Sequence, residues 1–177
     1  MEEIQKELEK DIKKIIVLAA DTVDKAPFIR KVIPNYSEDK YFIKKNEYLF
    51  EDKEKEKTII PVFDLPFSYL NSKISINFDS SVVILMYAFN SYTSFNLVMQ
   101  YYQCFKPTKK NYKVILLGIE NWSKKEVQTE VGKSTQKKRK FDAFYEISIK
   151  NAEKMNVVFA KAAELLLKND GCCNCFK

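Results

Sequence analysis

The apolar residues of this chain fall into short unbroken runs and helical repeats, separated by polar segments. Residues 15–20 form an unbroken β-branched and aliphatic run, which is typical of a strand buried on both faces of a parallel sheet. We therefore predict a strand over 13–19. After a short polar loop, Pro27 opens an apolar repeat at roughly helical spacing, which predicts a helix over 26–33. α/β proteins usually place a ligand loop between such a strand and helix.

The polar and aromatic segment that follows predicts a β-hairpin. Polar and apolar residues alternate between 41 and 50, as in a half-buried strand. We expect the charged run at 51–57 to be the solvated tip and the apolar residues 58–63 to be the returning strand. Because Pro61 cannot donate a ladder hydrogen bond, we expect a bulge or irregular pairing there.

Both ends of the chain carry helical patterns. Residues 1–12 are rich in Glu and Lys, with Ile4 and Leu8 on one potential helical face, and predict a short helix that is packed on the domain or frayed. Between 151 and about 168, apolar residues recur at the i, i+3 and i+4 spacing of a helix. They are Met155, Val158, Phe159, Ala162, Leu165 and Leu166. Gly171 can then provide the left-handed cap.

The composition indicates one globular domain. The chain has 177 residues, of which 46% are hydrophobic and 14% aromatic, enough for a sizeable core. It contains only three glycines, which is few for a nucleotide-binding protein. There is no apolar run of 18 residues and no signal-peptide pattern, so we expect a cytosolic origin.

The charge and the cysteines narrow the function classes further. A formal charge of +6 permits anionic membranes or nucleic acid without specifying either. The basic run at 133–140 is expected to be a solvated loop or helix face, with a lipid or nucleic-acid patch as the alternative. Cys172, Cys173 and Cys175 crowd at one end, unlike a disulfide framework. Three thiolates without any histidine do not complete a structural zinc site.

The loop after the first strand resembles the phosphate-binding loop of the Ras-like small GTPases, with most of its chemistry removed. The family pattern is Gly, four residues, then Gly-Lys-Ser/Thr. In this chain Ala19 and Asp24 stand at the two glycine positions, Lys25 keeps the lysine, and Ala26 replaces the hydroxyl residue that holds magnesium in the family.

The resemblance continues in the correct order and at the family's spacings over about residues 12–168. Asp64 keeps the Asp of the family's Asp-x-x-Gly motif, while Phe67 replaces its Gly and Ser68 replaces the water-positioning Gln. Residues 81–95 resemble the family's buried strand, turn and Ser-Phe-opened helix, with Ala88 at the Asp position. Residues 113–118 resemble the next buried strand.

The guanine-recognition motifs are also altered. The specificity motif Asn-Lys-x-Asp aligns with residues 119–122, and Trp122 replaces the Asp that accepts two hydrogen bonds from the guanine edge. The Glu-Thr-Ser-Ala-Lys loop keeps Ser148 and Lys150, but its Ala has become Ile149. The terminal cysteines make the resemblance closest to the Rab type, whose cysteines carry prenyl groups.

The resemblance implies an α/β small-GTPase-like (P-loop NTPase) fold: a three-layer domain with a mostly parallel sheet, one antiparallel strand and helices on both faces. It divides the chain into a charged extension (1–11), a Rab-like G domain (12–168) and a short Cys-rich tail (169–177). We expect a nucleotide-binding-impaired pseudo-GTPase that acts as a membrane-associated interaction module in vesicle traffic, on the cytosolic face of an endomembrane. Its expected partners are effector or regulator proteins and the membrane, without nucleic acid.

The resemblance also supplies the candidate site. Lys25, Asp64, Ser148 and Lys150 are expected to form a vestigial nucleotide site; alternatively Lys25 is a solvated loop residue, Asp64 forms a turn, and Ser148 and Lys150 cap the last helix. We expect no catalytic residue and no metal ligand. We further expect the Asp24 carboxylate to accept hydrogen bonds from the first helical turn, in place of a phosphate.

Three alternatives remain open from the sequence. The tail cysteines are expected to be lipidated, by prenylation or palmitoylation, although an unmodified tail is possible and the four-from-end position of a Cys-a-a-X signal is occupied by Asn174. A divergent but working GTPase would bind GTP or GDP and magnesium through altered residues. An unrelated flavodoxin-like binding domain would have a different strand order.

Overall fold

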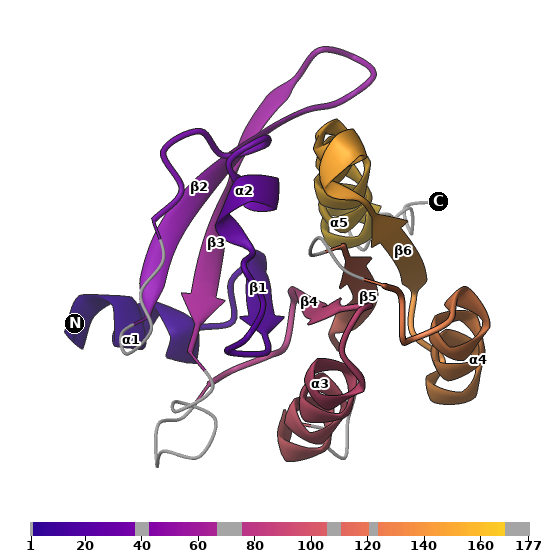
Figure 1. The fold of residues 1–177 in the computed structure, drawn as a ribbon. Helices are drawn as coiled ribbons and strands as arrows, with labels where there is room; N and C mark the ends of the chain where they lie inside the picture. The colour runs from indigo at the N-terminus through magenta and orange to yellow at the C-terminus, as the bar shows by residue number, and fades with distance from the viewer. Residues whose placement is uncertain (1, 38–42, 67–75, 106–110, 121–123, 169–177) are drawn as a thin grey trace, which may run out of the picture.

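A computed structural model describes residues 2–37, 43–66, 76–105, 111–120 and 124–168. Its sheet has the strand order β2-β3-β1-β4-β5-β6 (Figure 1). The strands are β1 (Lys14–Ala19), β2 (Lys44–Glu51), β3 (Lys57–Leu65), β4 (Ser81–Ala88), β5 (Lys113–Ile119) and β6 (Ala143–Ile147). Only β2 and β3 pair antiparallel; the other neighbours are parallel. The small-GTPase-like fold class is therefore confirmed. The five parallel strands alone have the order 2-1-3-4-5 of a flavodoxin-like sheet, and the antiparallel edge strand β2 is what distinguishes this sheet from it.

Helices cover both faces of this sheet. They are α1 (Glu2–Glu9), α2 (Ala26–Ile29), α3 (Tyr92–Phe105), α4 (Thr129–Arg139), the 3₁₀ helix η2 (Ile149–Lys154) and α5 (Met155–Leu167). In Figure 1, α3 and α4 lie on one side of the sheet and α5 on the other. The helix α2 packs against η2.

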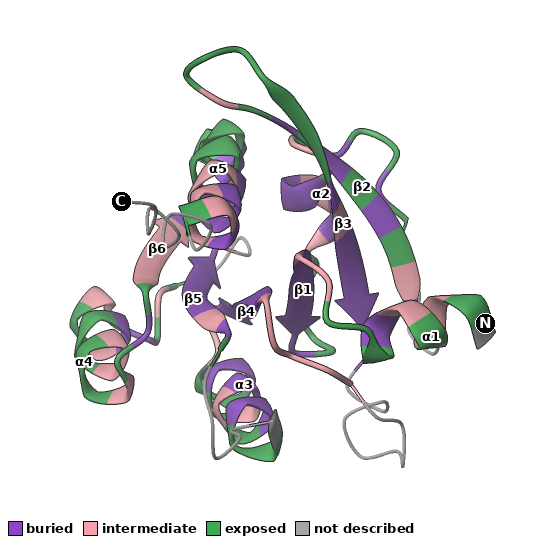
Figure 2. Ribbon diagram, turned by 180° about the vertical axis from the view of Figure 1, so that it is seen from behind, coloured by how far each residue is buried: buried purple, intermediate pink, exposed green. Residues whose placement is uncertain are grey.

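The core is centred on β1 and β4. All residues of both strands are buried, which Figure 2 shows as continuous purple ribbons. Helices on both faces exclude water from a central parallel strand, and this is why such strands read as unbroken apolar runs. In β2 buried and exposed residues alternate instead, because water reaches one face of the hairpin. The strand predicted at 13–19 is confirmed.

The predicted hairpin forms, but without the expected bulge. Residues 52–56 form the turn, where the Asp52 carboxylate accepts hydrogen bonds from the N–H groups of Glu54 (2.8 Å) and Glu56 (2.9 Å). The register from β2 to β3 is uninterrupted, and Pro61 lies opposite Glu47. Pairing of β3 with β1 begins only at Val62, so the sheet has no second neighbour at the proline that would need its missing N–H.

The helix predicted over 26–33 is shorter than expected. Regular α-helix ends at Ile29, whose carbonyl then accepts hydrogen bonds from the N–H groups of Val32 and Ile33, both at 2.9 Å. The chain then continues in turns as far as Ile33. Because Ile33 precedes Pro34, a regular helical conformation is disfavoured for it, and the helix does not continue further.

The charged N-terminal segment is a packed helix. Leu8 is fully buried, and its carbonyl accepts a hydrogen bond from the Asn77 N–H at 3.0 Å. The Lys45 ammonium lies 2.8 Å from Glu7 Oε2. At the end of the segment, the buried Lys14 ammonium donates to the Lys10 carbonyl at 2.8 Å.

The last helical segment begins as a 3₁₀ turn and becomes α-helical at Met155. Asn151 has non-helical backbone angles (φ −124°, ψ 34°), which marks the change of helix type. The predicted apolar face of α5 is confirmed as its buried face, although Leu165 is only partly buried.

Candidate functional site

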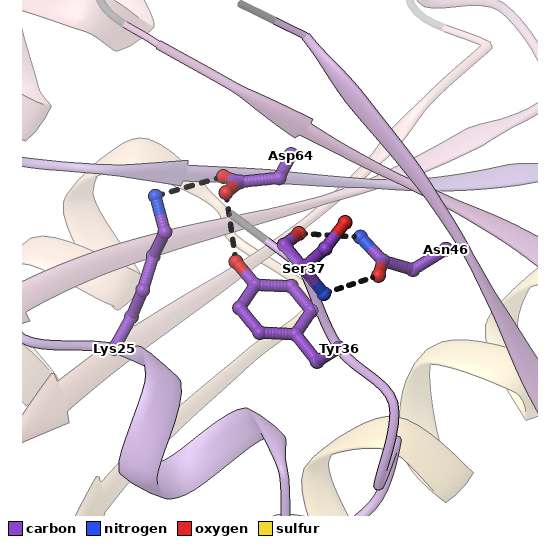
Figure 3. Close-up of polar contacts among 5 residues, drawn as sticks. All are labelled: Lys25, Tyr36, Ser37, Asn46 and Asp64. Atoms are coloured by element: carbon purple, nitrogen blue, oxygen red, sulfur yellow. Dashed lines mark hydrogen bonds and ion pairs between the residues drawn. The ribbon is translucent and has the colours of Figure 1, made fainter. Parts of the chain in front are cut away.

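Three side chains from separate segments meet beside the carboxyl ends of β1 and β3 (Figure 3). Lys25 follows the loop after β1, and Asp64 is the penultimate residue of β3. The parallel register places Asp64 beside Val17, so both chain segments leave the sheet at the same edge. The Lys25 ammonium lies 2.8 Å from Asp64 Oδ1, and the Tyr36 hydroxyl donates to Asp64 Oδ2 at 2.8 Å. We call these three residues the Asp64 cluster.

The Asp64 cluster is almost closed to water. The Asp64 side chain is 1% exposed and the Lys25 side chain 12%. Burial raises the pKa of the Asp64 carboxyl above its ordinary value, while the Lys25 ammonium and the Tyr36 hydroxyl act in the opposite direction. A buried carboxylate without such partners would be costly, so the three groups stabilise one another.

A second set of contacts holds the backbone next to Tyr36. The Ser37 N–H donates to Asn46 Oδ1 at 2.8 Å, and Asn46 Nδ2 donates to the Ser37 carbonyl at 3.0 Å. Arg30 Nε also donates to the Tyr36 carbonyl, at 3.4 Å. Tyr36 is therefore tied to β3 through its hydroxyl, and the backbone of Ser37 is tied to β2 through the Asn46 side chain.

Lys25 and Asp64 were predicted from the sequence as site residues, whereas Tyr36 and Asn46 were not. The sequence did contain a signal for Asn46, which falls in the same alternating phase of β2 as Tyr48 and Phe50. In the structure this phase is buried, and Asn46 is 7% exposed. A polar residue in a buried phase usually has a specific partner. Tyr36 lies in an irregular segment, 28 residues from its acceptor, and no local pattern indicates this contact.

The prediction that Asp24 caps the first helix is wrong. Asp24 is exposed, and the residue at the cap position is Lys25, whose side chain makes no capping hydrogen bond. The N–H groups of Phe28 and Ile29 both donate to the Lys25 carbonyl, at 3.1 and 3.0 Å. Pro27 has no N–H, so this short helix leaves few amides for a carboxylate to satisfy.

Ser148 and Lys150 take the structural role that was the alternative interpretation. Ser148 is the N-cap of η2, and its Oγ accepts a hydrogen bond from the Lys150 N–H at 3.3 Å. Lys150 is exposed. Both residues follow β6, which β4 and β5 separate from β1 in the sheet.

A second polar cluster, also missed, joins the loop before α4 to β6. Glu146 Oε2 accepts hydrogen bonds from the Lys125 ammonium and the Thr129 hydroxyl, both at 2.7 Å. The Lys125 ammonium also lies 4.8 Å from the centre of the Phe89 ring, within the range of a cation–π interaction. These contacts anchor the chain just after residues 121–123, which the structure does not describe.

The predicted basic run lies on the surface of the protein, and several other predicted residues lie outside the described part of the chain. The basic run forms much of α4, where Lys133, Lys137 and Lys138 are exposed, so it lies on an exposed helix face as expected; exposure does not separate a solvated face from a lipid or nucleic-acid patch. Phe67, Ser68, Trp122 and the three tail cysteines are not among the described residues. Within the described ranges, no helix combines the length and apolar character needed to cross a bilayer.

The strand order, the single antiparallel strand and the position of Lys25 after β1 define a small-GTPase-like domain. The sequence model of the Ras family matches residues 67–168, more than half of the chain. The chain therefore belongs to the Ras family. A comparison with curated proteins finds no match.

Proposed function

We propose that this Ras-family protein is a degenerate Rab-like pseudo-GTPase, a protein-interaction module in which an internal ion pair takes the place of bound nucleotide. The observation that carries the proposal is the 2.8 Å contact between Lys25 and Asp64. By resemblance, these two residues stand where the family keeps its phosphate lysine and the aspartate of the magnesium shell. Here each neutralises the other.

The residues present fit a magnesium nucleotide poorly. A phosphate at Lys25 would compete with Asp64 for the same ammonium and would place a second negative charge beside a carboxylate of 1% exposure. Ala26 is buried and has no hydroxyl to offer a metal. By resemblance, Trp122 stands where the family has the Asp that accepts two hydrogen bonds from guanine. An indole has one N–H donor and no acceptor, so it cannot replace that Asp. Unpaired polar groups on the guanine would weaken binding further.

The same contacts support a function in binding proteins. In the family, nucleotide orders the segment between the first helix and the second strand. In this chain Tyr36 and Ser37, within that segment, are held against β3 and β2 by Asp64 and Asn46. The part of the surface around residues 36 and 37 would then be the same with or without nucleotide, and could be offered to an effector or regulator.

Membrane attachment in this proposal depends on the tail. Lipidation of Cys172, Cys173 or Cys175, by prenyl or palmitoyl groups, would hold the protein on the cytosolic face of an endomembrane. Two lipids are needed for stable anchoring, whereas one is marginal. Metabolic labelling with prenyl and palmitoyl analogues tests this, with a variant carrying serine at all three positions as the control. Absence of label from the unaltered protein would contradict the attachment.

Calorimetric titration of the full chain with GTP and GDP, each with magnesium, tests the nucleotide site. We expect no binding, or binding much weaker than micromolar. A submicromolar dissociation constant would instead support a divergent, working GTPase. A single-turnover assay addresses hydrolysis, which we expect to be negligible because Ser68 replaces the water-positioning Gln and residues 24–56 contain no threonine to close over a metal.

A further inference from the structure

A separate cavity lies beside the amino ends of the strands, whereas the Asp64 cluster lies beside their carboxyl ends. Its volume is about 280 Å³. It is lined by Lys13, Ser80, Ser81, Asn111, Lys113, Leu165 and Leu166. The polar lining residues lie at or just before the starts of β1, β4 and β5, and the two leucines come from the last turns of α5. The loops that lead into β1, β4 and β5, together with the end of α5, thus form the walls of the cavity.

The lining of this cavity suits an anion. Its polar residues within the described part of the chain are two lysines, two serines and an asparagine, with no carboxylate among them. Each lysine ammonium carries three N–H donors, so it can bind an anion in addition to an existing partner. Ser81 already donates its hydroxyl hydrogen to the Asp79 carbonyl at 3.2 Å, and it contributes to the wall of the cavity.

Charges of both signs surround the cavity. The Lys113 ammonium forms an ion pair with Asp142, at 3.8 Å from Oδ1, and Asp142 Oδ2 accepts a hydrogen bond from the Val114 N–H at 2.8 Å. On the β1 side, burial lowers the pKa of the neighbouring Lys14 to about 8, with Asp11 and Asp79 acting in the opposite direction. An anion in the cavity would therefore share Lys113 with Asp142, while the described lining residues themselves include no carboxylate.

The loops that form the cavity are held together before any ligand binds. The Ser80 N–H donates to the Asn111 carbonyl at 3.2 Å, which joins the start of β4 to the start of β5. Ser80 has a left-handed backbone (φ 54°), which is uncommon for a residue other than glycine. A lining that is already in place reduces the ordering cost of binding.

The size of the cavity restricts the ligand. A water molecule takes roughly 30 Å³, so the cavity holds a small anion with a few waters. This volume lies at the lower end of the roughly 300–1,000 Å³ typical of small-molecule sites, so the cavity suits a small ligand. We propose that this cavity binds a single phosphate group, either as inorganic phosphate or as part of an anionic lipid headgroup. Binding of a lipid headgroup rests on the membrane attachment proposed above, since α5, which lines the cavity, is followed in the sequence by the cysteine-containing tail. Binding of inorganic phosphate does not rest on that attachment.

NMR titration of the full chain with inorganic phosphate tests the chemistry. We expect saturable shifts of the Asn111 side-chain amide and the Leu165 and Leu166 methyl groups, with a midpoint in the millimolar range. Lys13→Met and Lys113→Met should each weaken binding by at least about tenfold, the loss of one charge-assisted contact. Lys133→Met, which removes an exposed lysine of α4, should change nothing. Unaltered spectra of distant residues would show that each variant is folded.

Vesicle binding separates the two sources. The unlipidated chain is mixed with phosphatidylcholine vesicles that contain either a phosphoinositide or phosphatidylserine at equal charge. A preference for phosphoinositide that Lys113→Met removes supports the headgroup; phosphate binding without such a preference supports the free ion. Shifts that do not saturate, or that neither lysine variant alters, would overturn the site, and this outcome is independent of nucleotide binding and lipidation.

Discussion

Replacing Lys25 by methionine should destabilise this protein through Asp64. Methionine keeps much of the lysine's length but removes the charge that faces a carboxylate of 1% exposure. In a GTPase that depends on nucleotide, loss of the phosphate lysine acts through the ligand. In this chain we expect the loss to appear in the free energy of unfolding of the protein alone.

The magnitude follows from the burial of the pair. Removing one partner of a buried ion pair costs about 3–5 kcal/mol, because the other charge is left without compensation. The Tyr36 hydroxyl still donates to Asp64 at 2.8 Å, and the carboxyl can take up a proton, so we expect the lower end, about 3 kcal/mol at pH 7. Without Lys25 the pKa of Asp64 should rise further. Since a raised pKa in the folded state favours folding at low pH, the deficit should shrink as the pH falls toward 5.

Urea denaturation followed by circular dichroism measures this change, with a constant m-value as the check that the unfolding transition is comparable. Lys57→Met is the matched control: its ammonium lies 3.9 Å from Glu51, and both side chains are more than half exposed. Such a pair contributes at most about 1 kcal/mol. If Lys25→Met costs no more than Lys57→Met, or if its cost does not vary with pH, the Lys25–Asp64 pair does not stabilise the fold as argued here.

Three further substitutions test other parts of the structure by the same denaturation assay. Gly132→Ala would place a Cβ within contact distance of the Phe144 ring, closer than real Cβ atoms approach, and should destabilise by about 1–2 kcal/mol despite the better helix propensity of alanine. Phe144→Leu should relieve this cost, and no loss in the single variant would show that α4 shifts freely. Burial lowers the pKa of the Lys14 ammonium from 10.5 to about 8, so this charge opposes folding at neutral pH, and Lys14→Met removes that opposition. In the unaltered protein stability should therefore rise between pH 8 and 10.5, and this slope should vanish in the variant; a slope that persists would assign it to another group. Ser94→Ala removes the fully buried hydroxyl that bonds the Ala88 backbone at 3.0 Å, and should cost about 1–3 kcal/mol, whereas Ser94→Thr tests whether restoring the hydroxyl recovers it.

Much of the fold could be predicted from the sequence because its cause is local. The unbroken apolar run of β1 requires burial on both faces, and only a central strand provides that environment. The charged run at 51–57 has to reach water, so the hairpin turns there. The spacing of the apolar residues in α5 determines which face is buried. Each of these features follows from neighbours in the sequence.

The errors arose where the outcome depended on how one segment meets another. Pro61 needs no bulge because β1 pairs with β3 only beyond it, a fact of register. Asp24 caps nothing because α2 is a single short turn, in which Pro27 has no N–H and the N–H groups of Phe28 and Ile29 already donate to the Lys25 carbonyl. Sequence patterns indicate that a residue can form a hydrogen bond, but not whether another group has already taken the partner.

The order of the elements and the residue types at Ala26 and Trp122 can be read from the sequence, since an alanine has no hydroxyl and a tryptophan has no carboxylate wherever they lie. The contacts that Lys25 and Asp64 make could be found only in the folded chain. The parallel pairing of β1 and β3 brings the loop that carries Lys25 to Asp64, and the turns after α2 deliver Tyr36 to the same carboxylate. Contacts between residues so far apart in the chain depend on backbone geometry accumulated over whole elements, and no local spacing encodes them.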